Sequence, residues 1–194
     1  MRWSTLRVPA DESWRSLKER QGFLRLRGRE SMSSLHRQSL VALRQQAFFC
    51  SAETELEFEP EHFQQMAGLI VYYGTKDYVY LRITHDEVLG KCLGIVRSVD
   101  GVYDDSICAQ IPLLPGASCR LKVLIERESA QFYYSVDSTL WEKIGPSLDI
   151  YHLSDDFPAY IRFTGTFIGM CAQDLSGTFH AADFDYFEYK ELSR

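Results

Sequence analysis

The sequence predicts an all-β protein, an antiparallel β-sandwich, on three observations. Aromatic residues make up 13% of the chain, with 11 tyrosines and 12 phenylalanines, a composition that favours pleated sheets over helical bundles. From Phe49 onward, short apolar or alternating runs are separated by turn residues. The length of 194 residues suits one domain with a buried core, and no repeat or linker divides the chain. We therefore expect a single sandwich over residues 1–194.

The clearest strand covers residues 52–59. Four uncharged side chains occupy one face of this segment and four glutamates the other, which is the period of two of a half-buried strand. Residues 68–73 are a continuous apolar run, typical of a strand covered on both faces. A turn at residues 74–77 then leads into a strand at 78–84, so these segments predict a central hairpin.

Turn residues and alternation mark the remaining elements. Asp100 followed by Gly101 is a tight-turn signal, after which a returning strand is expected from Val102. Further strands are expected at residues 92–99, 119–126, 131–136, 161–170 and 183–190. Before residue 49, the pattern predicts a short helical turn at 15–21 and strands at 23–27 and 39–46.

Composition and charge exclude several classes of protein. Lys plus Arg is 21 against 27 for Asp plus Glu, a net charge of −6, so no nucleic acid is expected as a partner. The longest apolar stretch, residues 67–73, is far shorter than the roughly 18 residues of a membrane span, so no membrane is expected either. The N-terminus lacks the apolar segment and cleavage site of a secretory signal, and we therefore expect a cytoplasmic protein.

The cysteines predict neither a disulfide framework nor a zinc site. They are odd in number, widely spaced and never arranged Cys-x-x-Cys: Cys50, Cys92, Cys108, Cys119 and Cys171. We expect most of them to be buried, reduced thiols.

The acidic residues offer one candidate catalytic arrangement. Glu53, Glu55 and Glu57 share a strand face, where neighbours lie roughly 6 to 7 Å apart from the rise of a strand. That distance falls within the spacing of the two carboxyls of glycoside hydrolysis. A glutamate row on a solvated sheet face is the more ordinary interpretation, and nothing in the local sequence would raise the pKa of one carboxyl. The sequence therefore predicts no catalytic residue.

Metal-ligand residue types occur without a metal-binding pattern. Residues 85–87 read His-Asp-Glu, but adjacent strand residues point to opposite faces and chelate poorly. The acidic pairs at 155–156 and at 183 and 185 have calcium-type oxygens outside any recognisable multi-ligand loop. We predict no metal site and no cofactor, and calcium at these acidic pairs stays open as the alternative.

Residues 131–141 have the form of an aromatic strand, an acidic turn and a tryptophan. This segment resembles the Tyr-Ser-x-Asp-Gly-x-x-Trp hairpin of concanavalin A-like sandwiches, with Ser138 where glycine is usual. Trp141 is predicted either to anchor the core, the commoner role, or to stack on a sugar ring.

Five stretches, in order along the chain, carry a resemblance to a known family. Residues 3–9, 22–31, 63–69, 163–170 and 182–189 resemble the C-terminal domain of bacterial β-xylosidases of glycoside hydrolase family 43. The resemblance implies a concanavalin A-like jelly roll, which in that family follows a five-bladed β-propeller. Residues 1–20 then correspond to the segment after the propeller.

The resemblance also implies how the chain takes part in catalysis. In the family the propeller carries the catalytic carboxylates, so this chain alone is expected to be inactive. The parent enzyme would be an inverting β-xylosidase or an α-L-arabinofuranosidase. The expected partners are that propeller and, through it, a xylo-oligosaccharide.

Phe163 is the site residue that the resemblance implies. A loop phenylalanine of the sandwich reaches over the propeller's pocket, and it matches Phe163 in the run Phe163, Thr164, Gly165. An aromatic ring there would form an apolar wall and exclude water from a short pocket. The alternative is a core residue, because Phe163 lies in an apolar run.

Two other classes of function stay open from the residues. A free-standing, lectin-like carbohydrate-binding module would use exposed aromatics on a concave sheet face, for which Tyr72 and Tyr80 are candidates beside Tyr73, Tyr78 and Tyr103. An interaction domain would expose an apolar patch and form a homo-oligomer.

Overall fold

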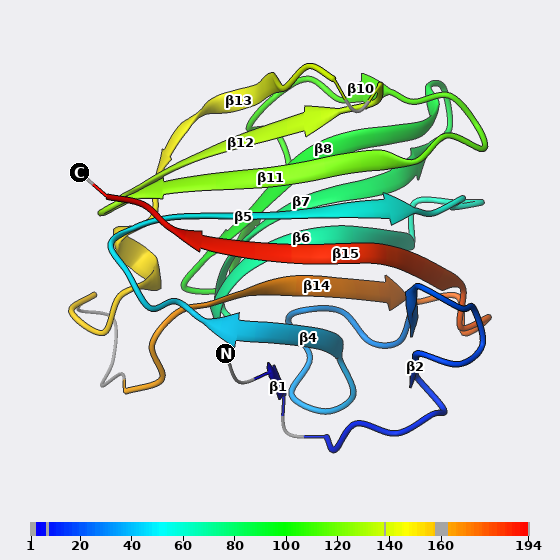
Figure 1. Cartoon of the computed structure of the whole chain (residues 1–194), viewed down its shortest axis with the longest axis horizontal. Coiled ribbons are helices and arrows are strands. Elements are labelled where there is room, and N and C mark those ends of the chain that lie inside the picture. Colours follow the sequence, from blue (N-terminus) through cyan, green and yellow to red (C-terminus); the bar gives the residue numbers. More distant parts are fainter. Residues whose placement is uncertain (1–2, 7, 138, 158–162, 194) are drawn as a thin grey trace.

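The computed structural model describes residues 3–6, 8–137, 139–157 and 163–193, which build two antiparallel sheets stacked face to face (Figure 1). Within these residues sheet A has eight strands, in the order β1 (Trp3–Thr5), β4 (Ser39–Arg44), β14 (Phe167–Asp174), β6 (Gln65–Gly74), β7 (Asp77–Asp86), β8 (Gly90–Val99) and β10 (Ile111–Pro112), with β9 (Val102–Asp104) beside β8. Among the described residues sheet B has seven strands, in the order β13 (Glu142–Asp149), β12 (Ser129–Ser135), β11 (Cys119–Glu126), β5 (Phe49–Glu57), β15 (Ala181–Glu191), β3 (Leu24–Arg27) and β2 (Arg15–Ser16). The predicted antiparallel β-sandwich is confirmed.

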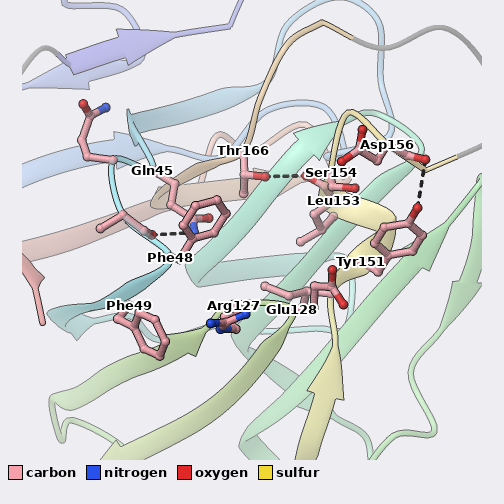
Figure 2. A pocket seen from close by; sticks show the side chains of 13 residues that line it. Gln45, Phe48, Phe49, Arg127, Glu128, Tyr151, Leu153, Ser154, Asp156 and Thr166 are labelled. Atoms are coloured by element: carbon pink, nitrogen blue, oxygen red, sulfur yellow. Dashed lines mark hydrogen bonds between the residues drawn. The ribbon is translucent and has the colours of Figure 1, made fainter. Parts of the chain in front are cut away.

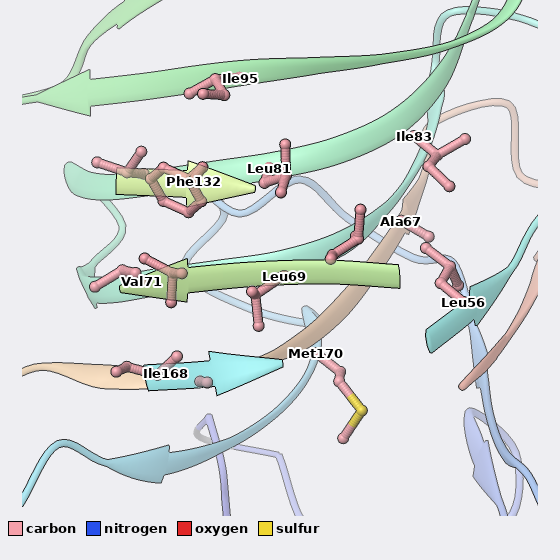
Figure 3. Close-up of a cluster of buried hydrophobic side chains, with 14 of the residues drawn as sticks. Leu56, Ala67, Leu69, Val71, Leu81, Ile83, Ile95, Phe132, Ile168 and Met170 are labelled. Atoms are coloured by element: carbon pink, nitrogen blue, oxygen red, sulfur yellow. The ribbon is translucent and has the colours of Figure 1, made fainter. Parts of the chain in front are cut away.

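The main core lies between the two sheets. Alternate residues of β5 point into it, so Ala52, Thr54 and Leu56 are buried while the intervening glutamates face outward. Figure 3 shows that β6, β7, β8 and β14 of sheet A contribute most of the labelled aliphatic side chains, with Phe132 approaching from β12 of sheet B. The period of two read from the sequence therefore separates the core face from the solvent face.

A second buried cluster covers the outer face of sheet A. We call it the outer cluster, and its members are Met32, Leu40, Ala42, Ile70, Tyr72, Tyr78, Tyr80, Val96 and Cys171. Met32 comes from the segment before β4, whose residues lie over the sheet. This cover explains why residues 68–73 read as a continuous apolar run, because both faces of β6 are buried.

Two glycine-dependent turns set the ends of strands. Asp100 and Gly101 both have positive φ, 48° and 82°, as a type I′ hairpin turn requires, and β9 begins at Val102 as predicted. Gly165 has φ 71°, and β14 begins only at Phe167. The predicted strand at residues 161–170 is therefore too long, because the left-handed turn at Gly165 breaks the extended backbone; residues 161 and 162 lie outside the described residues.

The predicted helical turn at residues 15–21 is wrong. Residues 15 and 16 form β2, which pairs with Leu26 and Arg25 of β3. Trp14, immediately before β2, is 1% exposed, and its indole N–H donates to the Pro9 carbonyl. Because this tryptophan packs against the core, the adjacent segment lies at the edge of sheet B and pairs as a strand. The local periodicity of the sequence gives no signal for this long-range contact.

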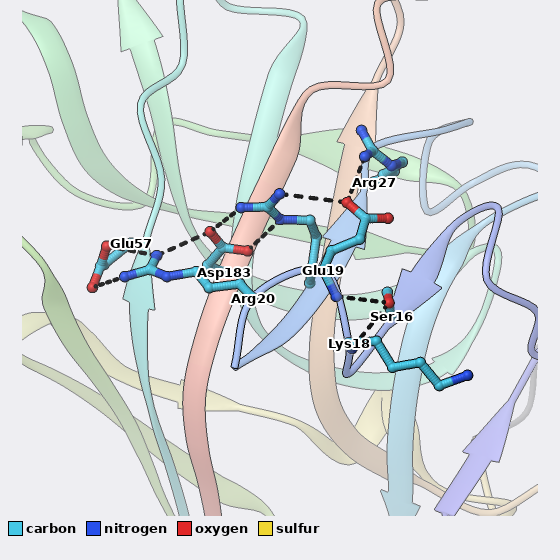
Figure 4. Close-up of polar contacts among 8 residues, drawn as sticks. Ser16, Lys18, Glu19, Arg20, Arg27, Glu57 and Asp183 are labelled. Carbon is cyan, nitrogen blue, oxygen red and sulfur yellow. Dashed lines mark hydrogen bonds and ion pairs between the residues drawn. The ribbon is translucent and has the colours of Figure 1, made fainter. Parts of the chain in front are cut away.

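An ion-pair network ties this edge to the centre of sheet B (Figure 4). Arg25 donates to both oxygens of Asp183, and Arg20 bridges Asp183 and Glu57 at 2.8 to 2.9 Å. Burial by itself would raise the pKa of Asp183, but the hydrogen bonds from Arg25 and Arg20 outweigh it and hold the pKa below its ordinary value. The Asp183 carboxylate is thus committed to two guanidinium groups.

Candidate functional site

Loops from both sheets gather at one end of the sandwich, which we call the Phe163 end. It consists of residues 45–48, 127–128, 150–157 and 163–166, and includes the 3₁₀ helix η1 (Tyr151–Leu153). Between these loops lies a hollow of about 750 Å³, into which Phe48, Arg127 and Tyr151 project (Figure 2). Phe48 is 76% exposed, so this end offers apolar surface to a partner.

Phe163 is a surface residue at this end, outside any strand. Its side chain is 86% exposed. The alternative that Phe163 belongs to the core is therefore wrong. The left-handed backbone at Gly165 separates Phe163 from β14, so its ring does not continue the inward alternation of that strand. Whether Phe163 covers a pocket stays a prediction.

The backbone beside Phe163 is held by a buried tyrosine. Tyr73, the penultimate residue of β6 and 4% exposed, donates from its hydroxyl to Oδ1 of Asp155 at 2.5 Å. The same hydroxyl accepts from the Thr164 amide at 3.2 Å, and Asp155 Oδ1 accepts from the Gly165 amide at 3.3 Å. The exposed ring thus follows directly before a backbone segment that hydrogen bonds fix in place.

A further bond closes the base of the loop. Thr166 donates from Oγ1 to the Leu153 carbonyl at 2.5 Å, and its own carbonyl accepts from the Gln45 amide at 2.9 Å (Figure 2). The sequence does not predict this support: it offers Tyr73 as a candidate sugar-stacking ring and Asp155 as part of a calcium-type acidic pair. Their roles depend on a contact between residues 82 positions apart, for which the sequence carries no local signal.

Tyr72 and Tyr80 are not available for sugar stacking, and those two predictions are wrong. They are 1% and 2% exposed, respectively, inside the outer cluster. Tyr72 stacks on Tyr78 with ring centroids 6.1 Å apart, and the Tyr80 hydroxyl donates to the Cys171 carbonyl at 3.4 Å. The segment around Met32 covers this face of sheet A. The alternation of the sequence therefore predicted correctly which face the tyrosines occupy, but it did not predict that another segment buries that face.

Trp141 lies outside both buried clusters, on the outer face of sheet B, and is half-buried. The Arg120 guanidinium carbon is 4.7 Å from its ring centroid and the Lys122 ammonium 4.9 Å. The predicted core anchor is therefore wrong, because cations rather than core side chains hold this ring. Sugar stacking by Trp141 stays a prediction.

Two of the three glutamates of the row on β5, Glu53 and Glu57, are paired with basic side chains. Glu53 pairs with Arg120 at 3.0 Å and with Lys122 at 3.4 Å, while Glu57 is held by both terminal nitrogens of Arg20. Burial by itself would raise the pKa of Glu53, but hydrogen bonds from Tyr186 and Arg120 leave it below its ordinary value. A general acid needs a raised pKa, so Glu53 does not have the environment of a general acid.

Two of the other acidic candidates, Asp86 and Asp183, are engaged in structural contacts. Asp86 accepts from the amides of Val88 and Leu89 and caps its own turn, and Asp183 is held by arginines as described above. In the described part of the chain, no group of three or more His, Cys, Asp and Glu side chains could hold a metal ion. Across the same residues, no helix is long and apolar enough to cross a membrane.

The cysteines are free thiols, and four of the five are buried. Burial raises the pKa of Cys119 to about 12. The predicted reduced, buried thiols are therefore confirmed for Cys50, Cys92, Cys119 and Cys171, whereas Cys108 is only partly covered.

Two antiparallel sheets of eight and seven strands among the described residues, stacked around one core, are the architecture of a concanavalin A-like β-sandwich. The chain belongs to the family described as the β-xylosidase C-terminal concanavalin A-like domain, whose family model matches residues 1–190. The family resemblance seen in the sequence is thereby confirmed.

Individual relatives agree with this assignment. The chain is 54% identical to a xylan β-1,4-xylosidase from Bacillus halodurans C-125, with a TM-score of 0.95 over 97% of this chain and 36% of that chain. It is 40% identical to a β-xylosidase of Bacillus subtilis over 97% of this chain and 36% of that protein. It is 39% identical to a xylan 1,3-β-xylosidase of a Vibrio species, over 97% and 35% of the two. The chain thus spans about a third of the length of these relatives.

Proposed function

We propose that the chain is the non-catalytic accessory domain of a β-xylosidase or α-L-arabinofuranosidase, and that Phe163 closes one side of the substrate pocket of a catalytic domain. The observation that carries this proposal is the 86% exposure of Phe163, directly before backbone that Tyr73 and Asp155 fix by hydrogen bonds. An exposed phenylalanine next to backbone that is already fixed is suited to contact a partner, because docking then costs little additional conformational entropy.

The Phe163 end supplies the surface for that docking. Phe48 is 76% exposed and Tyr151 37%, and both line the hollow beside the loop that carries Phe163. Arg127 adds a charged group at the same place. An exposed apolar area bordered by polar groups is typical of a surface that another domain covers.

The chemistry of the parent reaction would belong to the catalytic domain. Inverting hydrolysis of a xyloside needs one carboxyl to protonate the leaving oxygen and a second to activate water, roughly 6.5 to 9.5 Å away. The ring of Phe163 would contribute an apolar wall against the sugar and keep bulk water from the pocket. The purified chain alone should therefore not cleave an aryl β-xyloside; turnover abolished by one Asp or Glu substitution in it would contradict the proposal.

A chimera tests the role of Phe163 directly. The chain would replace the corresponding third of the Bacillus halodurans xylosidase, to which it is 54% identical. Phe163→Ala should lower kcat/KM roughly threefold to tenfold, the worth of one aromatic contact. The matched control is Phe179→Ala, since Phe179 is 51% exposed in the turn between β14 and β15, at the opposite end of those strands. Equal activity of the Phe163→Ala chimera and the unsubstituted chimera would refute the proposal.

The burial of most candidate tyrosines disfavours a lectin-like surface built from them. Of the five candidates, only Tyr103 is exposed, at 51%. Retardation by insoluble xylan, with loss of retardation in Trp141→Ala, would instead support carbohydrate binding on sheet B. A homo-oligomer in solution, measured by sedimentation equilibrium and abolished by Phe48→Asp, would favour an interaction domain.

A further inference from the structure

A second cavity, distinct from the Phe163 end, lies on the outer face of sheet A. It has a volume of about 740 Å³, within the range of small-molecule sites, and we call it the Arg82 groove. Its floor is the outward-facing row of β7, including Tyr80 and Arg82, and its rim includes Phe63, Tyr103 and Gln110. No function described above uses this groove.

Arg82 is a buried cation without full hydrogen bonding. Its side chain is 3% exposed, and neither Nε nor Nη1 has a hydrogen-bond partner. The guanidinium lies over glycine: Arg82 pairs with Gly68 on β6 and Gly94 on β8, and a Cβ built on Gly94 would stand 3.7 Å from Nη1. The absence of a side chain at Gly94 leaves room beside Nη1 of the guanidinium, whereas Gly68 is packed directly against the backbone of β7.

The acidic residues at the rim do not neutralise this charge. The Asp86 carboxylate accepts from the amides of Val88 and Leu89, and Glu87 and Asp105 are exposed to solvent. Within the described residues, no carboxylate forms an ion pair with Arg82. A buried cation without a counter-ion is unfavourable, and a ligand carboxylate that the guanidinium fork can hold would remove that cost.

The groups around the guanidinium fit a sugar ring. Tyr103 is 51% exposed and Phe63 61%, so both present ring surface at the rim. Burial raises the pKa of Tyr103 and the charge of Arg82 opposes that shift, which agrees with a phenol that lies beside the guanidinium. Gln110 accepts from the Cys92 thiol through Oε1 at 2.7 Å, which leaves its amide N–H groups to donate to a ligand.

We propose that the Arg82 groove binds a carboxylate-bearing saccharide, a uronic acid, with the sugar carboxylate on Arg82 and the ring against Tyr103. This inference goes beyond the accessory role proposed above, and it needs no catalytic domain. The two proposals can therefore fail separately, because the groove is tested on this chain alone.

The test measures binding of four small probes to the purified chain by two-dimensional NMR titration. The probes are glucuronate, its methyl ester, xylose and acetate at constant ionic strength. Glucuronate should bind at least tenfold more tightly than the methyl ester and xylose, because these lack the charge, and more tightly than acetate, which lacks the ring. Equal affinity for glucuronate and its ester would overturn the role of the carboxylate, and equal affinity for glucuronate and acetate would overturn the saccharide.

Substitutions place the site on the chain. Arg82→Met should abolish the preference for glucuronate over its ester, and Tyr103→Ala should weaken glucuronate several-fold while it leaves acetate unchanged. Tyr103 is a rim residue, so this variant carries the test if Arg82→Met does not fold. Phe179→Ala, which removes an exposed ring outside the lining of the groove, is the control and should bind as the unsubstituted chain does. Unchanged glucuronate binding in Tyr103→Ala, or in a folded Arg82→Met, would overturn the proposal.

Discussion

Asp174 should stabilise the fold through a charged, fully hydrogen-bonded carboxylate. The residue ends β14 and is 4% exposed. Its Oδ1 accepts from the Ser176 amide and hydroxyl at 2.9 and 2.5 Å, and its Oδ2 from the Thr178 hydroxyl and the His180 amide at 2.6 and 2.9 Å. These bonds fix the turn that carries the chain from sheet A to sheet B.

The magnitude follows from the pKa of this carboxyl. Burial by itself would raise the pKa of Asp174, but the hydrogen bonds from Ser176, Thr178 and His180 outweigh it and lower the pKa from 3.8 to about 2. This difference corresponds to about 2 kcal/mol of folding stability. Because the folded pKa is the lower one, the stabilisation is complete above about pH 5 and is lost as the pH falls through 3.8 towards 2.

Asp174→Asn is the perturbation, and urea unfolding at pH 7 and at pH 3 is the assay. At pH 7 the substitution should lower the free energy of unfolding by about 2 kcal/mol, and at pH 3 the difference should be smaller. Asp185→Asn, which removes an exposed carboxylate from β15, controls for the change in net charge. A difference independent of pH, or one below about 0.5 kcal/mol at pH 7, would refute the reasoning.

Three further substitutions test the surface, the groove and the sheet. Phe163→Ala should change the free energy of unfolding by less than about 0.5 kcal/mol, since the side chain is 86% exposed; a loss of several kcal/mol in urea would show that the ring is buried. Arg82→Met should raise the free energy of unfolding by about 1 to 4 kcal/mol, because it removes a buried charge without a counter-ion. A lower melting temperature of the variant would contradict this account. Gly68→Ala should cost roughly 1 to 3 kcal/mol, because its Cβ would lie 2.1 Å from the Leu81 carbonyl oxygen; unchanged stability in urea would show that β6 and β7 can separate at no cost.

Much of the fold could be predicted from the sequence because strand alternation and turn chemistry are local. The period of two in residues 52–59 identified the core face of β5, and the positive φ values at Asp100 and Gly101 match a turn that this dipeptide favours. Two of these predictions failed, one through a long-range contact of Trp14 and one through the local backbone conformation of Gly165. Trp14 draws β2 to the sheet edge, and Gly165 ends the extended backbone before β14.

The candidate sites were less predictable than the fold for the same reason. Alternation reports which face of a strand a side chain occupies, but not whether another segment covers that face. Tyr80 and Arg82 lie on the same face of β7, and only the tertiary structure shows that both are buried there, Tyr80 inside the outer cluster and Arg82 at the floor of a cavity. The sequence by itself determined the sandwich, its hairpins and its family. The exposure of Phe163, the cover over the tyrosines and the unpaired charge of Arg82 were decided by contacts between segments far apart along the chain, which no local pattern encodes.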